Sequence, residues 1–291
     1  DDCIMSEPAI QFNNPIAKNG KPSGQRCQSP IPHPQFAYNG RNRISVPIRK
    51  DITIMKYKLL GKSGLRVSEL CLGTMTFGVE WGWGVGKDES RKVFDAFISA
   101  GGNFIDTANL YTQGTSETYC GEFIGSLREQ IVLATKYTLN MRPTDPNGGG
   151  NHRKNMVQSL EASLKRLKTD YIDLYWVHAW DPLTPIDEVM RALDDLVRAG
   201  KILYVGISDA PAWVVSRANT LADNRNWTLF TGLQIQYSLV ERTPERDLLP
   251  MAKSMEIAIT PWGVLGGGVL SGKYKSQKER PANVRYSDPG G

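Results

Sequence analysis

The sequence predicts an α/β protein, specifically a (β/α)8 TIM barrel in which parallel strands alternate with helices. Three observations predict this class. Short apolar segments alternate with longer segments whose apolar residues recur at helical spacing. Several of the short segments end abruptly in polar residues, as buried parallel strands do where they deliver side chains to a site at their carboxyl ends. The length of 291 residues accommodates one such barrel, which takes about 250 residues.

The predicted elements begin at Met55. A Gly-Lys-Ser-Gly turn at 61–64 joins two short strand segments and predicts a hairpin that closes the N-terminal face of the barrel. Seven parallel strands are expected at 70–73, 103–108, 131–136, 171–178, 202–208, 233–237 and 257–260. Six helices are expected between them, beginning near 88, at 116 after a Thr115 or Ser116 cap, across 156–167, and near 185, 211 and 244.

The two ends of the chain depart from this pattern. No seventh helix or eighth strand is found, so the barrel is expected to be C-terminally incomplete, with its first and seventh strands at open edges. Residues 1–54 have no helical or alternating periodicity and are expected to be irregular, either disordered or an extension that is not native to the domain. A targeting peptide is the weaker alternative because the segment lacks an apolar core. The barrel domain is expected to span 55–291.

Composition argues against several classes of protein. No apolar run approaches the roughly 18 residues of a membrane span. The net charge of +5, from 35 Lys and Arg against 30 Asp and Glu, is too balanced for a nucleic-acid-binding surface. The four cysteines lack the spacing of a metal site. No metal is therefore expected, and reduced thiols in a cytoplasmic protein fit best.

Four polar residues follow strand segments at the predicted carboxyl edge. Asp106 lies near the end of the second strand and Tyr111 follows that strand. Lys136 ends the third strand and His178 ends the fourth. Taken singly, Asp106 is explained as a cap of the next turn, Tyr111 as a half-buried aromatic residue and His178 as a core histidine. Together they resemble the catalytic tetrad of the aldo-keto reductase family, and the resemblance extends over residues 56–274.

The resemblance implies an oxidoreductase that transfers a hydride from a nicotinamide cofactor to an aldehyde or ketone, reversibly. Negative charge develops on the carbonyl oxygen, so an acid must protonate it. Tyr111 is expected to be that acid and base, with Lys136 lowering the pKa of the phenol and Asp106 keeping Lys136 charged. His178 is expected to bind and orient the carbonyl oxygen. The remaining histidines, His33 and His152, are expected to be solvated.

The cofactor implied by the resemblance is NADPH, with NADH as the alternative. The chain has no strand-turn-helix GxGxxG motif, so the resemblance points to a barrel-type cradle instead. Its expected members are Gly73, Thr74, Met75 and Asp106 beside the nicotinamide, Ser208, Asp209 and Gln234 at its carboxamide, and Trp262, Gly263, Leu265, Gly267, Gly272 and Lys273 in a glycine-rich pyrophosphate loop. Asp209 stands where many members have Asn, and a carboxylate cannot donate a hydrogen bond to the carboxamide oxygen.

Two other functions remain open at this point. One is an inactive fragment, and the other is a regulatory cofactor-binding subunit similar to the potassium-channel β-subunits, which share the fold. The expected partner is a small-molecule carbonyl compound, with no nucleic acid and no membrane; the sequence does not indicate an oligomeric state. An aromatic pocket is one interpretation of Trp81, Trp83, Tyr137 and Trp180, and simple packing is the other.

Overall fold

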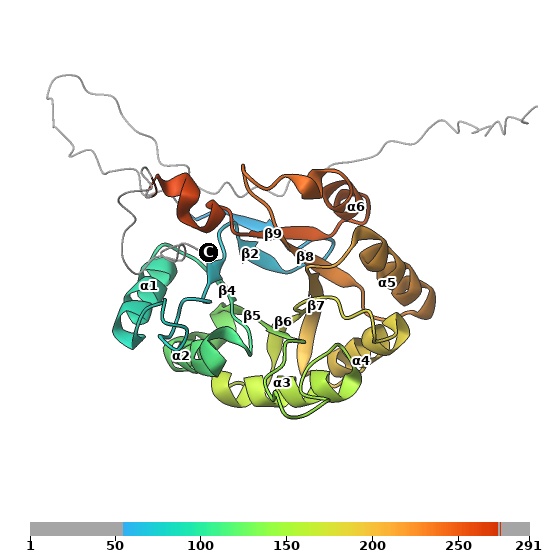
Figure 1. Cartoon of the computed structure of the whole chain (residues 1–291), viewed down its shortest axis with the longest axis horizontal. Helices are drawn as coiled ribbons and strands as arrows, with labels where there is room; N and C mark the ends of the chain where they lie inside the picture. Colours follow the sequence, from blue (N-terminus) through green and yellow to red (C-terminus); the bar gives the residue numbers. More distant parts are fainter. Residues whose placement is uncertain (1–54, 273, 275–291) are drawn as a thin grey trace, which may run out of the picture. The chain divides into compact units, whose positions relative to one another are not determined.

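The computed structural model describes residues 55–272 and residue 274. They form a curled sheet of seven parallel strands with helices around its outer side (Figure 1). Each strand pairs in parallel with the next strand along the chain, which is the order of a (β/α)8 barrel and confirms the predicted fold class. The strands are β3 (Leu72–Gly73), β4 (Phe104–Asp106), β5 (Val132–Tyr137), β6 (Ile172–Val177), β7 (Ile202–Ser208), β8 (Phe230–Gln236) and β9 (Ala258–Trp262). Residues 1–54 and Lys273, on which predictions were made, lie outside the described residues.

Six α-helices follow the strands and pack against the outer face of the sheet (Figure 1). They are α1 (Lys87–Ser99), α2 (Thr115–Ile124), α3 (Arg153–Leu167), α4 (Ile186–Arg198), α5 (Ala212–Arg225) and α6 (Leu248–Ser254). Short 3₁₀ segments adjoin them at η1 (Tyr111–Gly114), η2 (Gly125–Gln130), η3 (Thr243–Glu245) and η4 (Gly266–Ser271). The apolar residues predicted for the helix over 156–167 are confirmed as core residues, since Met156, Leu160, Leu164 and Leu167 are all buried.

The predicted caps of α2 are wrong. The residue that precedes the helix is Gly114, with φ of 93°, which has no side chain with which to cap the helix. The chain reaches α2 through a tight turn in the left-handed region, where glycine is the least strained residue. The Ser116 hydroxyl is turned toward the strands instead, where it bonds to Thr74 and Thr107.

The N-terminal hairpin closes one end of the sheet, as predicted. Strands β1 (Tyr57–Leu59) and β2 (Arg66–Ser68) pair in antiparallel fashion. Leu60 and Val67 are buried against the inner face of the sheet, in a cluster with Phe104, Val132 and residues of β6. This burial holds the hairpin at the amino-terminal end of the strands, opposite the carboxyl ends.

A tryptophan fills the inner side of the sheet close to the polar residues. Trp176 is fully buried and lies in register with Lys136 of β5 and Gly206 of β7. A Cβ atom on Gly206 would lie 2.3 Å from the indole, and one on Gly232 of β8 would lie 2.8 Å from it. Because atoms do not pack this closely, the two glycines create the space that the indole occupies.

Strands β3 and β9 are the outer strands of the described sheet, at the positions predicted for open edges. A groove of about 600 Å³ lies alongside β9 and reaches Cys71, just before β3. The hairpin forms one wall, and the end of α6 with β9 forms the other. None of the helices in the described part of the chain is both long and apolar enough to cross a bilayer.

Candidate functional site

A cavity of about 490 Å³ lies at the carboxyl ends of the strands. Inward-facing side chains recur at every second residue of a strand. This alternation determines which side chains line the cavity. Ser208, Gln234 and Thr260 are register partners on three adjacent strands, and all three line the cavity. Asp106 ends β4 on the same inner face, and Tyr111 and His178 reach the cavity from the segments that follow β4 and β6. The four predicted tetrad residues therefore meet at one place.

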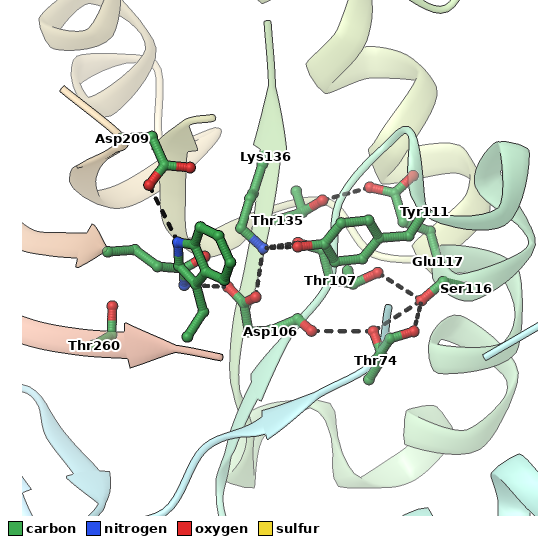
Figure 2. Close-up of polar contacts among 12 residues, drawn as sticks. Thr74, Asp106, Thr107, Tyr111, Ser116, Glu117, Thr135, Lys136, Asp209 and Thr260 are labelled. Carbon is green, nitrogen blue, oxygen red and sulfur yellow. Dashed lines mark hydrogen bonds and ion pairs between the residues drawn. The ribbon is translucent and has the colours of Figure 1, made fainter. Parts of the chain in front are cut away.

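Lys136 connects Asp106 and Tyr111 by hydrogen bonds (Figure 2). Its side chain is fully buried. The ammonium group donates to the Asp106 carboxylate, to the Thr107 carbonyl oxygen at 2.9 Å and to the Tyr111 hydroxyl oxygen at 2.9 Å. An ammonium has three N–H donors, so all three are used. The Tyr111 oxygen accepts from Lys136 and keeps its own O–H for another acceptor.

Asp106 is held by a second strand as well. Its Oδ2 atom pairs with Lys136, and its Oδ1 atom accepts a hydrogen bond of 3.3 Å from Gln234 Nε2. Both carboxylate oxygens are therefore engaged. A buried pair with this degree of hydrogen bonding keeps both charges in place, whereas removing either partner would leave an uncompensated buried charge.

The turn that presents Tyr111 is strained and firmly held. Thr112 and Gln113, directly after it, have φ of 46° and 57°, in the left-handed region that non-glycine residues seldom adopt. Thr112 Oγ1 donates to the Phe77 carbonyl oxygen at 2.6 Å and accepts from the Ser116 backbone N–H at 3.1 Å. These buried hydrogen bonds offset the strain and fix the position of the tyrosine.

Burial and Lys136 act in opposite directions on the phenol. Burial raises the pKa of Tyr111, while the Lys136 ammonium lowers it, and the net result is a pKa above the ordinary value for tyrosine. Lys136 therefore lowers the pKa of Tyr111 as expected, but burial raises that pKa by more. Burial alone would lower the pKa of Lys136, yet the charges and hydrogen bonds of Asp106 and Tyr111 raise it above its ordinary value. At neutral pH the site holds a cationic lysine and a protonated phenol.

His178 is a neutral imidazole at the wall of the cavity. Burial and the Lys136 charge lower its pKa from 6.5 to about 3. Its ring meets the Tyr111 ring edge-on, with centroids 5.8 Å apart. The Nδ1 atom is buried without a hydrogen-bond partner among the described residues. A neutral imidazole and a phenol that retains its proton can both donate hydrogen bonds to one oxygen atom placed between them.

The predicted cofactor residues fall into two groups. Eight of them line the cavity: Gly73, Met75, Asp106, Ser208, Asp209, Gln234, Trp262 and Gly263. The others that the structure describes do not: Thr74 is buried among hydroxyl groups, and Leu265, Gly267 and Gly272 belong to the loop after β9. In that loop Gly267 and Gly272 have φ of 63° and 76°, a conformation that favours glycine.

A nicotinamide fits these residues. A Cβ atom on Gly73 would meet no atom within 4 Å, so the glycine leaves open space at the cavity wall. Ser208 and Gln234 add a hydroxyl and an amide from neighbouring strands. Together they offer the donors and acceptors that a carboxamide requires.

Sequence reasoning missed several residues of the site. Cys71, Thr76, Thr260 and Pro261 also line the cavity. Alternation from Ala258 along β9 would have placed Thr260 on the inner face. Behind the cavity, Glu117 is fully buried and accepts from Thr135 Oγ1 at 2.5 Å (Figure 2). It also accepts from Arg166 Nε at 2.6 Å. Nothing in the spacing of the α2 residues marks that glutamate as buried.

For Tyr137 the packing interpretation holds, because it is fully buried on the outer side of the sheet and stacks on Tyr175 with centroids 5.2 Å apart. The prediction for His152 needs correction. His152 is not merely solvated. It precedes α3, and its Nδ1 atom accepts a hydrogen bond of 3.3 Å from the Asn155 backbone N–H, so it caps the helix.

The fold and the cavity define a (β/α) barrel protein with a buried Asp–Lys pair, a phenol and a neutral imidazole at the carboxyl ends of its strands. The model of the aldo/keto reductase family matches residues 69–286. This chain belongs to the aldo/keto reductase family.

Similar proteins carry reductase and dehydrogenase names. A norsolorinic acid reductase of Emericella nidulans is 48% identical over 232 residues, which cover 76% of this chain and 60% of that protein. A putative aryl-alcohol dehydrogenase of Saccharomyces cerevisiae is 42% identical over 240 residues, covering 78% of this chain and 64% of that protein. The NADP(+) aryl-alcohol dehydrogenase of Phanerodontia chrysosporium is 41% identical over 241 residues, covering 78% and 62%. The matched region thus spans less than two thirds of each of these relatives.

Proposed function

We propose that this protein is an NADP(H)-dependent oxidoreductase that reduces an aldehyde or ketone to the alcohol, reversibly. The observation that carries the proposal is the hydrogen bonding of Lys136. Since all three of its N–H donors are used and one of them is given to the Tyr111 oxygen, the phenolic O–H remains for a ligand in the cavity. The family and the reductase names of the relatives support the same reaction.

The proposed roles follow from the geometry. Tyr111 gives its proton to the carbonyl oxygen, and the adjacent Lys136 stabilises the phenolate that is left. Asp106 holds Lys136 charged and in place. His178, neutral because its pKa is about 3, donates to the same carbonyl oxygen and orients it. The raised pKa of Tyr111 suits the acid role at neutral pH, and the reverse oxidation of an alcohol is favoured by alkaline pH.

The cofactor supplies the hydride, which no amino-acid side chain provides. We propose that Gly73, Met75, Ser208, Asp209 and Gln234 surround the nicotinamide. The pyrophosphate is assigned to the loop after β9, with Trp262, Gly263, Leu265, Gly267, Gly272 and Lys273. NADPH is preferred to NADH in this proposal, and the relative named for NADP(+) supports that preference.

We further propose an aromatic aldehyde or ketone as the substrate class. Two of the relatives are named for aryl alcohols. In this chain the Trp81 ring meets the Tyr111 ring edge-on, with ring centroids 6.3 Å apart. The ring centroids of Trp81 and Trp83 are 5.5 Å apart. These rings provide apolar, flat surfaces next to the proposed proton donor, against which an aromatic ring can pack.

The test is NADPH oxidation by the 291-residue chain over a panel of aryl and short aliphatic aldehydes and ketones, repeated with NADH. Tyr111→Phe is the matched variant because it removes only the hydroxyl group. We expect aryl substrates to be turned over, and Tyr111→Phe to lose more than about 100-fold in kcat, the scale of general acid catalysis, while binding of NADPH stays within about twofold of wild type. Activity of Tyr111→Phe within about tenfold of wild type would remove Tyr111 from the acid role.

The alternatives give different results in the same experiment. A regulatory subunit would bind NADPH without turning over any carbonyl compound, and an inactive fragment would do neither. The reductase and dehydrogenase names of the relatives do not favour these alternatives. The cytoplasmic location, the absence of a nucleic-acid partner and the boundaries of the barrel domain stay predictions.

A further inference from the structure

Asp209 is fixed at the cavity by its backbone and by its side chain. It directly follows β7, and its φ of 44° lies in the left-handed region. Its backbone N–H donates to the Gln234 carbonyl oxygen at 3.1 Å. Its Oδ1 atom accepts a hydrogen bond of 3.1 Å from the Trp262 indole N–H (Figure 2). The carboxylate therefore has a defined position between two strands of the cavity wall.

The charge of Asp209 is not balanced in the way that the charge of Asp106 is. Lys136 and Asp106 form an ion pair, and the other titratable groups near them, Tyr111, His178 and the Cys71 thiol, are neutral at pH 7. Asp209 has no ion-pair partner within the part of the chain that the structure describes. Among the described groups that line the cavity or lie directly beneath it, Asp209 therefore contributes an uncompensated negative charge.

Asp209 also acts electrostatically on the proposed reaction centre. Its negative charge helps to raise the pKa of Tyr111. Asp209 is exposed to solvent on one side, but the atoms packed around its carboxylate partly desolvate it and raise its pKa, and the Trp262 hydrogen bond and the Lys136 charge oppose that rise. A partly desolvated carboxylate of this kind is stabilised by a cation that enters the cavity.

We propose that Asp209 makes this site discriminate between the two redox states of its cofactor, binding the oxidised nicotinamide in preference to the reduced one. The inference rests on the proposed function. In the reduction, the carbonyl carbon receives a hydride from the nicotinamide, and the carbonyl oxygen receives a proton from Tyr111. The ring thereby passes from neutral to a charge of plus one, and Tyr111 later regains a proton from solvent. A carboxylate beside the ring stabilises the charged product, and a neutral residue in its place does not.

Two consequences follow for the reaction. The equilibrium on the enzyme between bound carbonyl with reduced cofactor and bound alcohol with oxidised cofactor shifts toward the alcohol. The oxidised cofactor also leaves more slowly than the reduced one. Asp209 thus shifts the equilibrium between the bound species, in addition to any hydrogen bond that it accepts from the carboxamide.

The experiment measures the Kd of NADP+ and of NADPH for the wild-type chain and for Asp209→Asn by titration calorimetry. Asparagine is the matched replacement because it has the same shape and also tolerates the left-handed conformation. We expect the ratio of the NADPH Kd to the NADP+ Kd to fall by about tenfold, the scale of one charge at short range in a partly hydrated site. Asp209→Glu, which retains the charge, should keep most of the wild-type ratio.

A control variant separates this effect from a change in overall charge. Asp223 lies exposed on α5, the helix that follows β7. Asp223→Asn changes the net charge of the protein by the same amount and should leave the ratio within about twofold of wild type. Asp209→Gly, also neutral and compatible with a positive φ, should repeat the effect of Asp209→Asn, so that a folding defect peculiar to one variant does not decide the result.

The outcomes separate a failure of the proposed function from a failure of the inference about Asp209. If the wild-type chain bound neither form of the cofactor, the proposed function would fail, and this inference with it. If the wild-type chain bound both forms and Asp209→Asn weakened them equally or left the ratio unchanged, only the inference would fail. An equal fall of the ratio in Asp223→Asn would likewise overturn it, because the effect would then reflect net charge.

Discussion

Replacing His178 with asparagine should remove part of the protein's sensitivity to acid. The imidazole has a pKa of about 3 in the folded protein, against 6.5 when it is exposed. The folded-state pKa is the lower one, so the native state binds fewer protons than the unfolded state between these two values. The stability that His178 contributes is therefore fully present above the unfolded pKa and is lost as the pH falls toward the folded one.

The magnitude follows from the two pKa values. Protonation of the unfolded histidine lowers the free energy of unfolding by about 2 kcal/mol between about pH 7 and pH 5. Asparagine does not titrate in this range, so His178→Asn should lack this component. Its stability at pH 7 is expected to differ from wild type for other reasons, and the quantity of interest is the change between the two pH values.

The assay is urea unfolding followed by tryptophan fluorescence at both pH values. Val177→Ala, at the preceding fully buried position, is the control for destabilisation alone. Its free energy of unfolding should lie below that of wild type by the same amount at both pH values. The reasoning is refuted if His178→Asn shows the same loss between pH 7 and pH 5 as wild type. In that case the imidazole would not be held neutral, and its proposed role as a neutral donor would lose its support.

Two further predictions concern the surroundings of Lys136. Lys136→Met should lower activity severely and move the alkaline limb of the pH profile to higher pH, because the ammonium that lowers the pKa of Tyr111 is lost. The pH–rate profiles of the variant and of wild type test this. An unmoved limb in an active variant would show that Lys136 does not set the pKa of the acid. Gly206→Ala should destabilise the fold by about 1–3 kcal/mol, since its Cβ would lie 2.3 Å from Trp176. Gly64→Ala is the control for Gly206→Ala in thermal unfolding, because a Cβ there meets no atom within 4 Å; equal effects of the two substitutions would contradict the packing argument.

The sequence by itself determined the order of the elements and which residues end the strands. Apolar segments that stop at Asp106, Lys136 and His178 predict buried parallel strands, because only strands covered on both faces are apolar along their whole length. All parallel strands of one sheet end at the same edge, so the chain order alone brings these residues together. Alternation along β7 and β8 likewise places Ser208 and Gln234 on the inner face.

Only the tertiary structure decided the balance of forces at the site. The raised pKa of Tyr111 depends on how far burial outweighs one ammonium group, and burial is a property of the packed molecule. The buried Glu117 and its partners Thr135 and Arg166 lie far apart in sequence, so no local pattern connects them. That no described residue forms an ion pair with Asp209 could be seen only in the structure, because a charge is compensated by what surrounds it in space and not by what adjoins it in the chain.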